Sequence, residues 1–312
     1  MLRSPGIVAN IIVGAKAEPY LAASLEAIAD VCDHAVINDN SGTPFGANAP
    51  VYSRSRLAAT GRLTVIRTRF ENFSVARNAC LEAIPRAFNG SWILFVDADE
   101  IHGAELPAMA NLLDRLPDDI DAVDGYSRHY WGSFRWWVAI DRRLCFFRHT
   151  PRVRWCGAVH EHLVGADRRA VLPSVWAHYG HVVTPRMEWE KSRLYASLGQ
   201  CDWAPDDATL AAATPADVYG QRARRAMPHR GAHAPFVAKV VAALSHSWSA
   251  NFHEIDRLVA MQSPADRARN ALRSVNYARL LGWRAAEARI RWGWSAGAEQ
   301  PARRLLPASR AV

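Results

Sequence analysis

The first 116 residues alternate between short apolar runs and segments with helical periodicity. The clearest run is Gly6 to Val13, which is mainly β-branched and apolar, as in a parallel strand buried on both faces. This alternation predicts an α/β fold with a Rossmann-like, mostly parallel sheet flanked by helices. Ligands of such sheets bind where the strands end, so the residues after each strand are the first candidates for a site. The other expected strands are 34–37, 63–66 and 92–96, and the expected helices are 19–31, 74–84 and 106–116.

An acidic tetrad, Asp97-Ala98-Asp99-Glu100, follows the fourth expected strand. If the extended chain continues into it, Asp97 and Asp99 point to the same side. Two adjacent carboxylates repel each other unless positive charge lies beside them, and Mg²⁺ and Mn²⁺ prefer carboxylate oxygens. The pattern therefore predicts a divalent metal site. The alternative is that Asp99 or Glu100 caps the next helix.

Three further segments lie at the ends of these strands or open the neighbouring helix. They are Lys16 to Leu21, the turn that begins at Asp39, and Phe70 to Asn78. Together with the acidic tetrad they resemble the bacterial, DxD-containing family 2 glycosyltransferases of the GT-A fold. Members of that family read approximately KNE…YL, vvDsgStD, nfs.aRN.al and WilflDaDE. The resemblance covers about residues 6–183 and implies an enzyme that uses a nucleotide sugar.

The resemblance implies donor-side roles for the acidic residues. Asp99 would bind Mn²⁺ or Mg²⁺, which bridges the donor diphosphate. Asp97 would contact the ribose or the sugar of the donor and help to hold the metal. Asp39 would recognise the base, although an Asx-turn is its alternative role.

The resemblance also assigns basic and amide side chains to the donor. Arg77 would approach the donor or its phosphates, with pairing to a surface carboxylate as the alternative, and Asn78 would support the loop. The first strand end departs from the family pattern, because Ala17 stands where the family has Asn. Glu18 is the donor-side candidate that remains there.

The segment Gly157 to Glu161 resembles the family's "g.vHE" element, in which a carboxylate deprotonates the acceptor. Glu161 is the candidate base and His160 the second choice, with a structural pairing of Glu161 to an arginine as the alternative. The later segment Trp176 to His181 resembles the family's "HyGy" element. There a histidine often completes the metal shell beside the DxD aspartate, which suggests His178 or His181 as a ligand.

An aromatic run from Tyr130 to Trp137 falls on the acceptor side in the resemblance. Trp131, Trp136 and Trp137 are its candidates for stacking on a sugar. A hydrophobic wall packed on later helices is an equal alternative for Trp136 and Trp137.

The pattern changes after residue 185, and we expect a catalytic domain over 1–185 and a mainly helical region over 186–312. Helices are expected near 187–201, 235–262 and 264–290, and residues 204–234 are expected to form a loop or linker. Acceptor binding, dimerisation and binding to a surface are the roles considered for this region.

The chain carries a formal net charge of +8, mostly from arginine. A basic surface suits phosphate-bearing ligands, nucleic acid or an anionic membrane face, without choosing among them. Rival functions are a basic nucleic-acid- or membrane-surface-binding protein with a degenerate transferase domain, and a nucleotidyltransferase. The second rival is weakened because Gly14-Ala15-Lys16 poorly matches the glycine- and arginine-rich loop that such enzymes carry.

The five cysteines, at positions 32, 80, 145, 156 and 201, are dispersed and form no CxxC pair, so we expect free thiols. No apolar run is long enough to span a membrane, and no secretory signal is recognised. A cytoplasmic protein is therefore expected, with peripheral membrane association as an option.

The combined prediction is a metal-dependent, inverting hexosyltransferase that uses a nucleoside-diphosphate sugar, with UDP-sugars favoured. The acceptor is left open among small molecules, lipid-linked glycans, peptides and nucleic acids.

Overall fold

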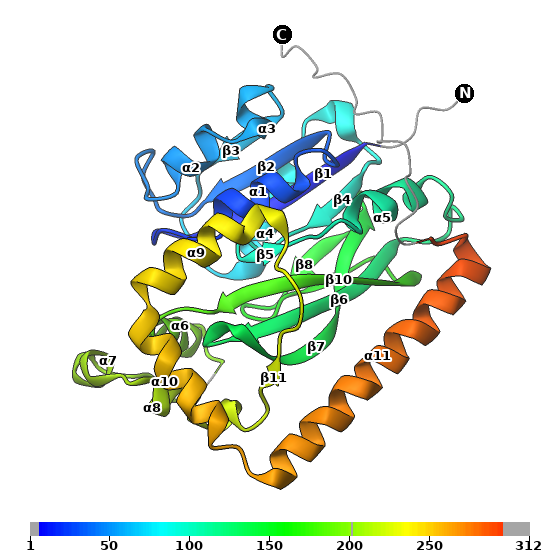
Figure 1. Cartoon of the computed structure of the whole chain (residues 1–312). Helices are drawn as coiled ribbons and strands as arrows, with labels where there is room; N and C mark the ends of the chain where they lie inside the picture. Colours follow the sequence, from blue (N-terminus) through cyan, green and yellow to red (C-terminus); the bar gives the residue numbers. More distant parts are fainter. Residues whose placement is uncertain (1–5, 201, 296–312) are drawn as a thin grey trace. The chain divides into compact units, whose positions relative to one another are not determined.

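A computed structural model describes residues 6–200 and 202–295 (Figure 1). The chain forms two compact units, each built from stretches that are separate in sequence. The first comprises the described residues of Met1–Tyr126, Arg142–Trp176 and Arg284–Val312, and the second comprises those of Ser127–Asp141 and Ala177–Trp283. Neither unit ends at residue 185, and the functional division predicted there stays a prediction.

The first unit holds the alternating part of the chain. Its elements are β1 (Ile7–Val13), α1 (Leu21–Ile28), β2 (His34–Asp39), α2 (Ala49–Ser53), α3 (Arg56–Ala59), β3 (Leu63–Ile66), α4 (Phe73–Glu82), the 3₁₀ helix η1 (Arg86–Phe88), β4 (Trp92–Phe95), β5 (Glu100–Ile101), α5 (Leu106–Leu113), β8 (Arg154–Cys156) and β9 (His162–Val164). Four elements run from one unit into the other: β6 (Ala122–Trp131), β7 (Ser133–Arg148), β10 (Arg169–His181) and α11 (Pro264–Trp292).

The second unit is mainly helical after β10. Its further elements are α6 (Pro185–Ser197), α7 (Asp207–Ala212), α8 (Pro215–Ala223), β11 (Met227–Pro228), the 3₁₀ helix η2 (Pro235–Val237), α9 (Ala238–Ser247) and α10 (Ser249–Ala260). The expected linker over 204–234 is wrong, because that stretch contains α7, α8 and β11. Both helices carry side-chain N-caps, from Asp206 to the Thr209 amide and from Thr214 to the Asp217 amide, which is why this Ala-rich stretch is helical.

The main sheet has the strand order β3-β2-β1-β4-β7-β6-β10-β5, with β11 paired to β7. β1 runs parallel to β2 and β4, and β2 runs parallel to β3. β7 then pairs antiparallel with β4. The register sets Val13 opposite Asp39, so the ends of β1 and β2 lie side by side. The predicted α/β fold class is confirmed.

Alternate residues of β1 pack on opposite faces of the sheet. Ile11 belongs to a cluster with Leu25 of α1 and Met109 of α5. Val8 belongs to a second cluster with Cys80 of α4. Helices α1 and α5 therefore cover one face and α4 covers the other, which explains why the strand is apolar on both faces apart from Asn10.

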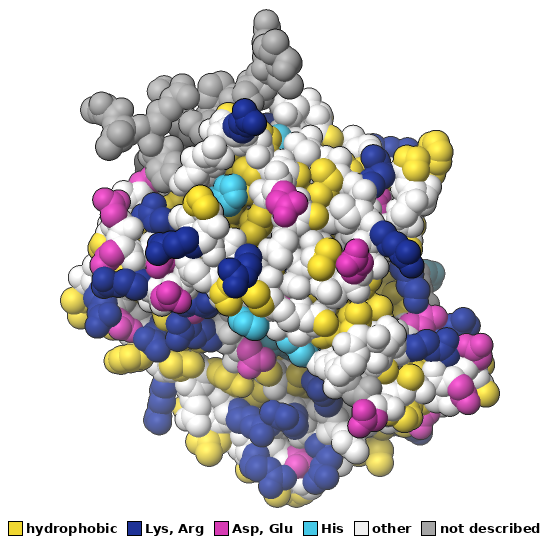
Figure 2. All heavy atoms as spheres, turned by 180° about the vertical axis from the view of Figure 1, so that it is seen from behind, with side chains coloured by type: hydrophobic (Ala, Val, Ile, Leu, Met, Phe, Trp, Pro, Cys, Tyr) yellow, Lys and Arg dark blue, Asp and Glu magenta, His cyan; other side chains and the backbone are white. Residues whose placement is uncertain are grey.

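The cysteines at 32, 80, 145 and 156 are free thiols, as expected, and Cys201 lies outside the described residues. None of the helices within residues 6–200 and 202–295 combines the length and the apolar character needed to cross a bilayer. On the face shown in Figure 2, Lys and Arg side chains gather in groups.

The N-terminus of α4 has a side-chain cap that we use as a test of the fold. Asn72 accepts a hydrogen bond from the Val75 amide at 2.9 Å. We predict that Asn72→Ala lowers the free energy of unfolding by about 1 kcal/mol, because an orphan helix amide loses its acceptor. Urea unfolding measures this. The exposed Asn89→Ala is the control, and an equal loss in both variants would contradict the assignment of the cap.

Candidate active site

The acidic tetrad forms a turn. β4 ends at Phe95, and the Glu100 amide donates to the Asp97 carbonyl at 3.0 Å. The expectation that Asp97 and Asp99 share a side through strand alternation is therefore wrong in its reasoning, because the chain is no longer extended there. The Asp97 amide in turn donates to Glu100 Oε2 at 3.3 Å, which ties the turn to its last carboxylate.

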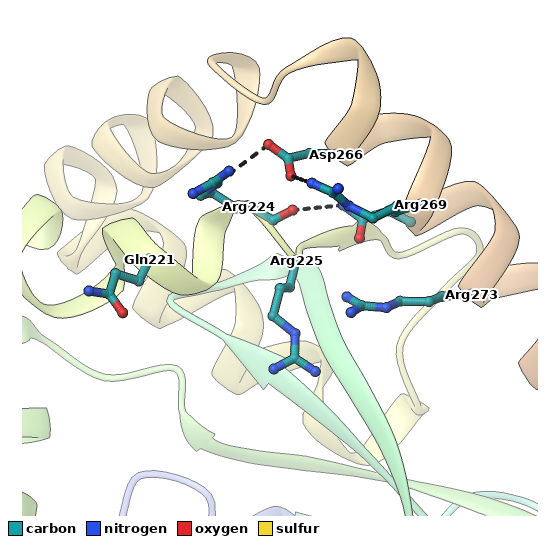
Figure 3. A pocket seen from close by; sticks show the side chains of 7 residues that line it. Gln221, Arg224, Arg225, Asp266, Arg269 and Arg273 are labelled. Atoms are coloured by element: carbon teal, nitrogen blue, oxygen red, sulfur yellow. Dashed lines mark hydrogen bonds and ion pairs between the residues drawn. The ribbon is translucent and has the colours of Figure 1, made fainter.

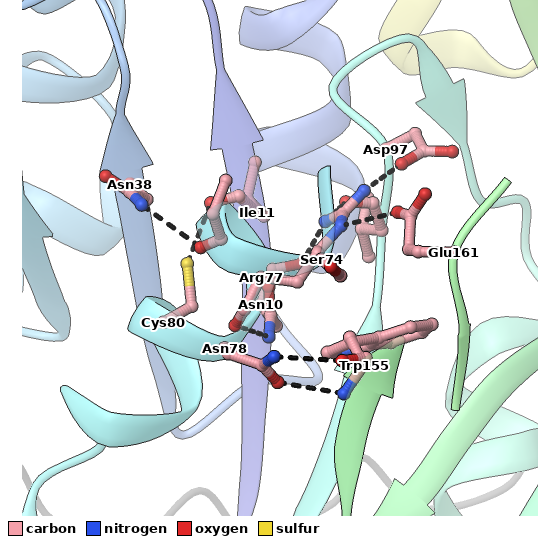
Figure 4. Close-up of polar contacts among 12 residues, drawn as sticks. Asn10, Ile11, Asn38, Ser74, Arg77, Asn78, Cys80, Asp97, Trp155 and Glu161 are labelled. Carbon is pink, nitrogen blue, oxygen red and sulfur yellow. Dashed lines mark hydrogen bonds and ion pairs between the residues drawn. The ribbon is translucent and has the colours of Figure 1, made fainter. Parts of the chain in front are cut away.

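Arg77 of α4 is the buried centre of this region, with 1% of its side chain exposed (Figure 4). Its Nη1 donates to the carbonyls of Asn10 and Val96, each at 3.1 Å, which fixes it between β1 and the end of β4. Its Nη2 pairs with Asp97 Oδ1, and its Nε donates to Glu161 Oε1 at 3.4 Å. The guanidinium is thus committed to backbone and carboxylates, which is a positioning role. The contact with donor phosphates predicted for it stays a prediction.

Arg143 of β7 approaches the same turn. Its Nη2 lies 3.2 Å from Asp97 Oδ2, so the two oxygens of Asp97 are shared between two arginines. Burial opposes the charge on Arg143, but the surrounding carboxylates outweigh burial and raise its pKa; in order of effect they are Glu100, Asp97, Glu161 and Asp99. Four carboxylates therefore act on one small region that holds the two guanidinium groups.

The loop that carries the predicted base is fastened to α4. Asn78 donates to the Trp155 carbonyl at 3.0 Å and accepts from the Trp155 amide at 2.8 Å. Glu161 pairs with Arg77 and keeps 11% of its side chain exposed. His160 has a φ of 52°, which makes it the one non-glycine residue with positive φ among those described. The arginine pairing foreseen as the alternative for Glu161 is thus present, and its role as base stays a prediction.

The other predicted donor residues lie at the ends of β1 and β2. Asp39 is fully buried; its Oδ1 accepts from the Ser41 amide at 3.0 Å and its Oδ2 accepts from the Tyr52 hydroxyl at 2.9 Å. This is the Asx-turn of the alternative interpretation, and base recognition by Asp39 stays a prediction. Glu18 accepts from the Tyr20 amide at 3.1 Å, and its own amide donates to Asn48 at 2.8 Å.

In the second unit, His178 and His181 of β10 meet His129 of β6. One ligand atom from each of the three lies within 4.8 Å of the others, a spacing that suits a bound metal ion. The Nδ1 atoms of His178 and His129 are 2.9 Å apart. His178 or His181 could therefore bind a metal ion together with His129.

Carboxylates lie beside two of these three imidazoles. His129 Nε2 lies 3.3 Å from Asp141, and His181 Nδ1 lies 2.8 Å from Glu188. Burial lowers the pKa of His181, and a neutral imidazole that donates from Nδ1 keeps a lone pair on Nε2. Pairing of the outer ring nitrogen with a carboxylate is the usual arrangement around protein-bound metals.

The three predicted acceptor-side tryptophans pack within the second unit. Trp131 is buried against His181, with ring centroids 4.2 Å apart. Trp137 is buried and donates to the Pro228 carbonyl at 3.1 Å. Trp136 is half-buried and donates to Asp256 at 2.6 Å. The contacts of Trp136 and Trp137 match the alternative of a hydrophobic wall, and stacking on an acceptor stays a prediction for all three tryptophans.

The glycosyl transferase family 2 model matches residues 11–171, just over half of the chain. The chain belongs to this family. The resemblance seen in its motifs is thereby confirmed, and the protein is a glycosyltransferase.

Several solved structures are similar to this chain at low identity. Mannosyltransferase PcManGT from Pyrobaculum calidifontis, in complex with GDP-Man and Mn²⁺, is 16% identical with a TM-score of 0.41, over 94% of this chain and 89% of that one. Residues 1–349 of S. aureus TarS are 12% identical with a TM-score of 0.39, over 92% of each chain. The same fragment with UDP-GlcNAc is 15% identical with a TM-score of 0.38, also over 92% of each chain. No curated protein matches this sequence.

Two residues of the glycosyltransferase escaped the sequence analysis. Arg143 lies between motifs, in a strand whose arginines resemble surface charge. His129 is a lone histidine 49 residues before His178, and only the neighbouring positions of β6 and β10 in the sheet bring the two together. The sequence offered one signal for Arg143 and His129, which is that each lies in a run of polar residues within an apolar, aromatic segment.

We predict that Arg77→Gln lowers the free energy of unfolding of the glycosyltransferase by about 3 kcal/mol, because Asp97 and two buried carbonyls lose their cation. Urea unfolding measures the loss, with the exposed Arg69→Gln as the control. Unchanged stability would show that Arg77 does not hold this region together.

We predict that His129→Ala weakens Zn²⁺ binding to the glycosyltransferase by about tenfold or more, because one of three clustered imidazoles is removed. Equilibrium dialysis against Zn²⁺ measures the affinity, and the exposed His246→Ala is the control. Equal affinity in wild type and His129→Ala would mean that the three histidines form a hydrogen-bonded cluster without a metal.

Proposed function

We propose that this glycosyltransferase is metal-dependent and inverting, and that it transfers a hexosyl group from a UDP-sugar to its acceptor. The observation that carries the proposal is the charge at the acidic turn. Four carboxylates and two arginines act on one another there, within the residues that match the family. An excess of negative charge at a strand end favours a cation with bound phosphate.

The donor set fits Mn²⁺ or Mg²⁺. Asp99 is proposed as the main ligand and Asp97 as its support, because both offer the hard oxygen atoms that these ions prefer. A divalent ion held there would supply positive charge to the leaving nucleoside diphosphate. His178 and His181 remain proposed metal ligands in the second unit.

Side chains of the protein would perform the other steps of the reaction. Arg77 and Arg143 hold the Asp97 carboxylate by its two oxygens, which fixes its direction before the donor binds. Glu161 is proposed to accept the proton of the acceptor hydroxyl as that oxygen attacks the anomeric carbon, and His160 is the second candidate. The C–O bond to the diphosphate breaks as the new glycosidic bond forms, so the anomeric configuration inverts.

Donor contacts are proposed for Asp39 and Glu18 at the adjoining ends of β2 and β1. Asn78 is proposed to act through the loop of Glu161, because its amide holds the backbone of Trp155. These proposals place the donor chemistry in the first 185 residues. Of the three acceptor-side candidates, Trp136 is the more accessible one, since Trp131 and Trp137 are buried.

The experiment that tests this function is release of nucleoside diphosphate from a panel of UDP-, GDP- and dTDP-sugars, with Mn²⁺ or with chelator. Water can take the place of the acceptor. We expect slow release from one donor class, UDP-sugars first, and none in chelator. Release that is equally fast in chelator would contradict metal dependence, and no release from any donor with any acceptor would contradict the proposal.

We predict that Glu161→Gln slows this release about 100-fold or more, because general base catalysis typically contributes at least that factor. The affinity for donor should stay within a few-fold of wild type. Glu82→Gln, an exposed change on α4, is the matched control. A rate unchanged in Glu161→Gln but lowered in His160→Ala would transfer the role of base to the histidine.

A further inference from the structure

The second unit contains a cavity of about 280 Å³ lined by arginines (Figure 3). Arg224 and Arg225 follow α8, and Arg269 and Arg273 lie in the first turns of α11. One carboxylate, Asp266, lines the cavity with them. The residues of this cluster have no role in the proposed transfer of sugar.

The backbone around the cavity is fixed by buried amides. Gln262 donates to the carbonyls of Ala223 and Ala226 at 2.7 and 2.9 Å. Asn270 donates to the carbonyls of Arg224 and Ala226 at 3.0 and 3.2 Å. The end of α8 is thereby fastened to the start of α11, so the arginines project from a rigid frame.

Positive charge in the cavity exceeds what Asp266 can balance. That carboxylate already pairs with Arg269 and Arg224, and the hydrogen bonds from Arg269 and Ser263 lower its pKa to about 2. Within residues 6–200 and 202–295, Arg225 and Arg273 have no carboxylate at ion-pair distance. Neighbouring guanidinium groups repel one another, and a phosphate group with its several acceptor oxygens would relieve this repulsion.

The same side of α11 continues as an apolar surface. Arg269, Leu272, Arg273, Asn276, Leu280 and Trp283 follow one another at intervals of one, three or four residues, which places them on one side of a helix. Leu272 is 61% exposed, Trp283 58% and Leu280 37%. Arg269 and Arg273 therefore stand at one end of this face with the exposed Leu272 between them, and Leu280 and Trp283 stand at the other end.

We propose that this face of α11, together with the arginine cavity, binds an anionic membrane surface. Lipid phosphates would enter the cavity, and Leu272, Leu280 and Trp283 would insert at the boundary between headgroups and acyl chains. A nucleic acid would match the charge but would offer nothing to the two leucines, so the lipid surface fits both ends of the face. α11 lies on such a surface and does not cross it.

Co-sedimentation with vesicles tests the charged end. Wild type should bind vesicles of phosphatidylcholine with a quarter phosphatidylglycerol and should not bind phosphatidylcholine alone. Arg225→Glu/Arg273→Glu should weaken binding by more than tenfold. The matched control Arg54→Glu/Arg86→Glu, which changes the net charge equally at two exposed sites of the first unit, should retain it. Equal losses in the two double variants, or no binding by wild type, would overturn the proposal.

A second pair of changes tests the exposed apolar side chains of the face and keeps the charge intact. Leu272→Ser/Trp283→Ser should also weaken vesicle binding by more than tenfold, while inorganic pyrophosphate binds it as tightly as wild type in calorimetry. If wild type binds pyrophosphate but neither pair of changes weakens binding to vesicles, the cavity is a site for free phosphates. If the Leu272→Ser/Trp283→Ser variant instead loses self-association in analytical ultracentrifugation, the face is an interface between two copies. Both of these results contradict the membrane proposal.

Discussion

The buried guanidinium of Arg77 is the interaction on which the first unit's site depends. It joins the backbone of β1, the residue after β4, the acidic turn and the loop of Glu161. A charge in such a place is costly unless it is paired and hydrogen-bonded, and here Arg77 makes four hydrogen bonds, two to carbonyls and two to carboxylates. The geometry of Asp97 and Glu161 therefore follows from the packing of α4 on the sheet, because α4 carries the arginine.

The elements of the parallel sheet were predictable because each has a strong local signal. β1, β2 and β3 follow apolar runs, and β4 ends one residue before the predicted boundary. Prediction failed where tertiary pairing decides. β7 and β10 are long strands, of 16 and 13 residues, and the polar residues along them mask their continuity in the sequence. The helices over 204–234 were missed because their capping residues were taken as loop residues.

The site was predictable to the extent that motifs adjoin strand ends. Asp97, Asp99, Arg77 and Glu161 were selected from such positions, and all four belong to one region of the first unit. Arg143 and His129 have no motif, since each acquires its neighbours only through strand pairing. The side-chain period that suggested a shared direction for Asp97 and Asp99 does not apply in a turn. Their closeness to the same arginine has a different cause, which is the hydrogen bonding of the turn itself.

The acidic turn is proposed to bind a metal together with a nucleoside diphosphate. The most direct measurement is calorimetric titration of UDP, GDP and dTDP into the protein, with Mn²⁺ and with chelator, for wild type, Asp99→Ala and the exposed control Asp118→Ala. UDP should bind to wild type and to Asp118→Ala in the presence of Mn²⁺, and chelator or Asp99→Ala should abolish the binding. Binding that persists unchanged in Asp99→Ala, or in chelator, would contradict it.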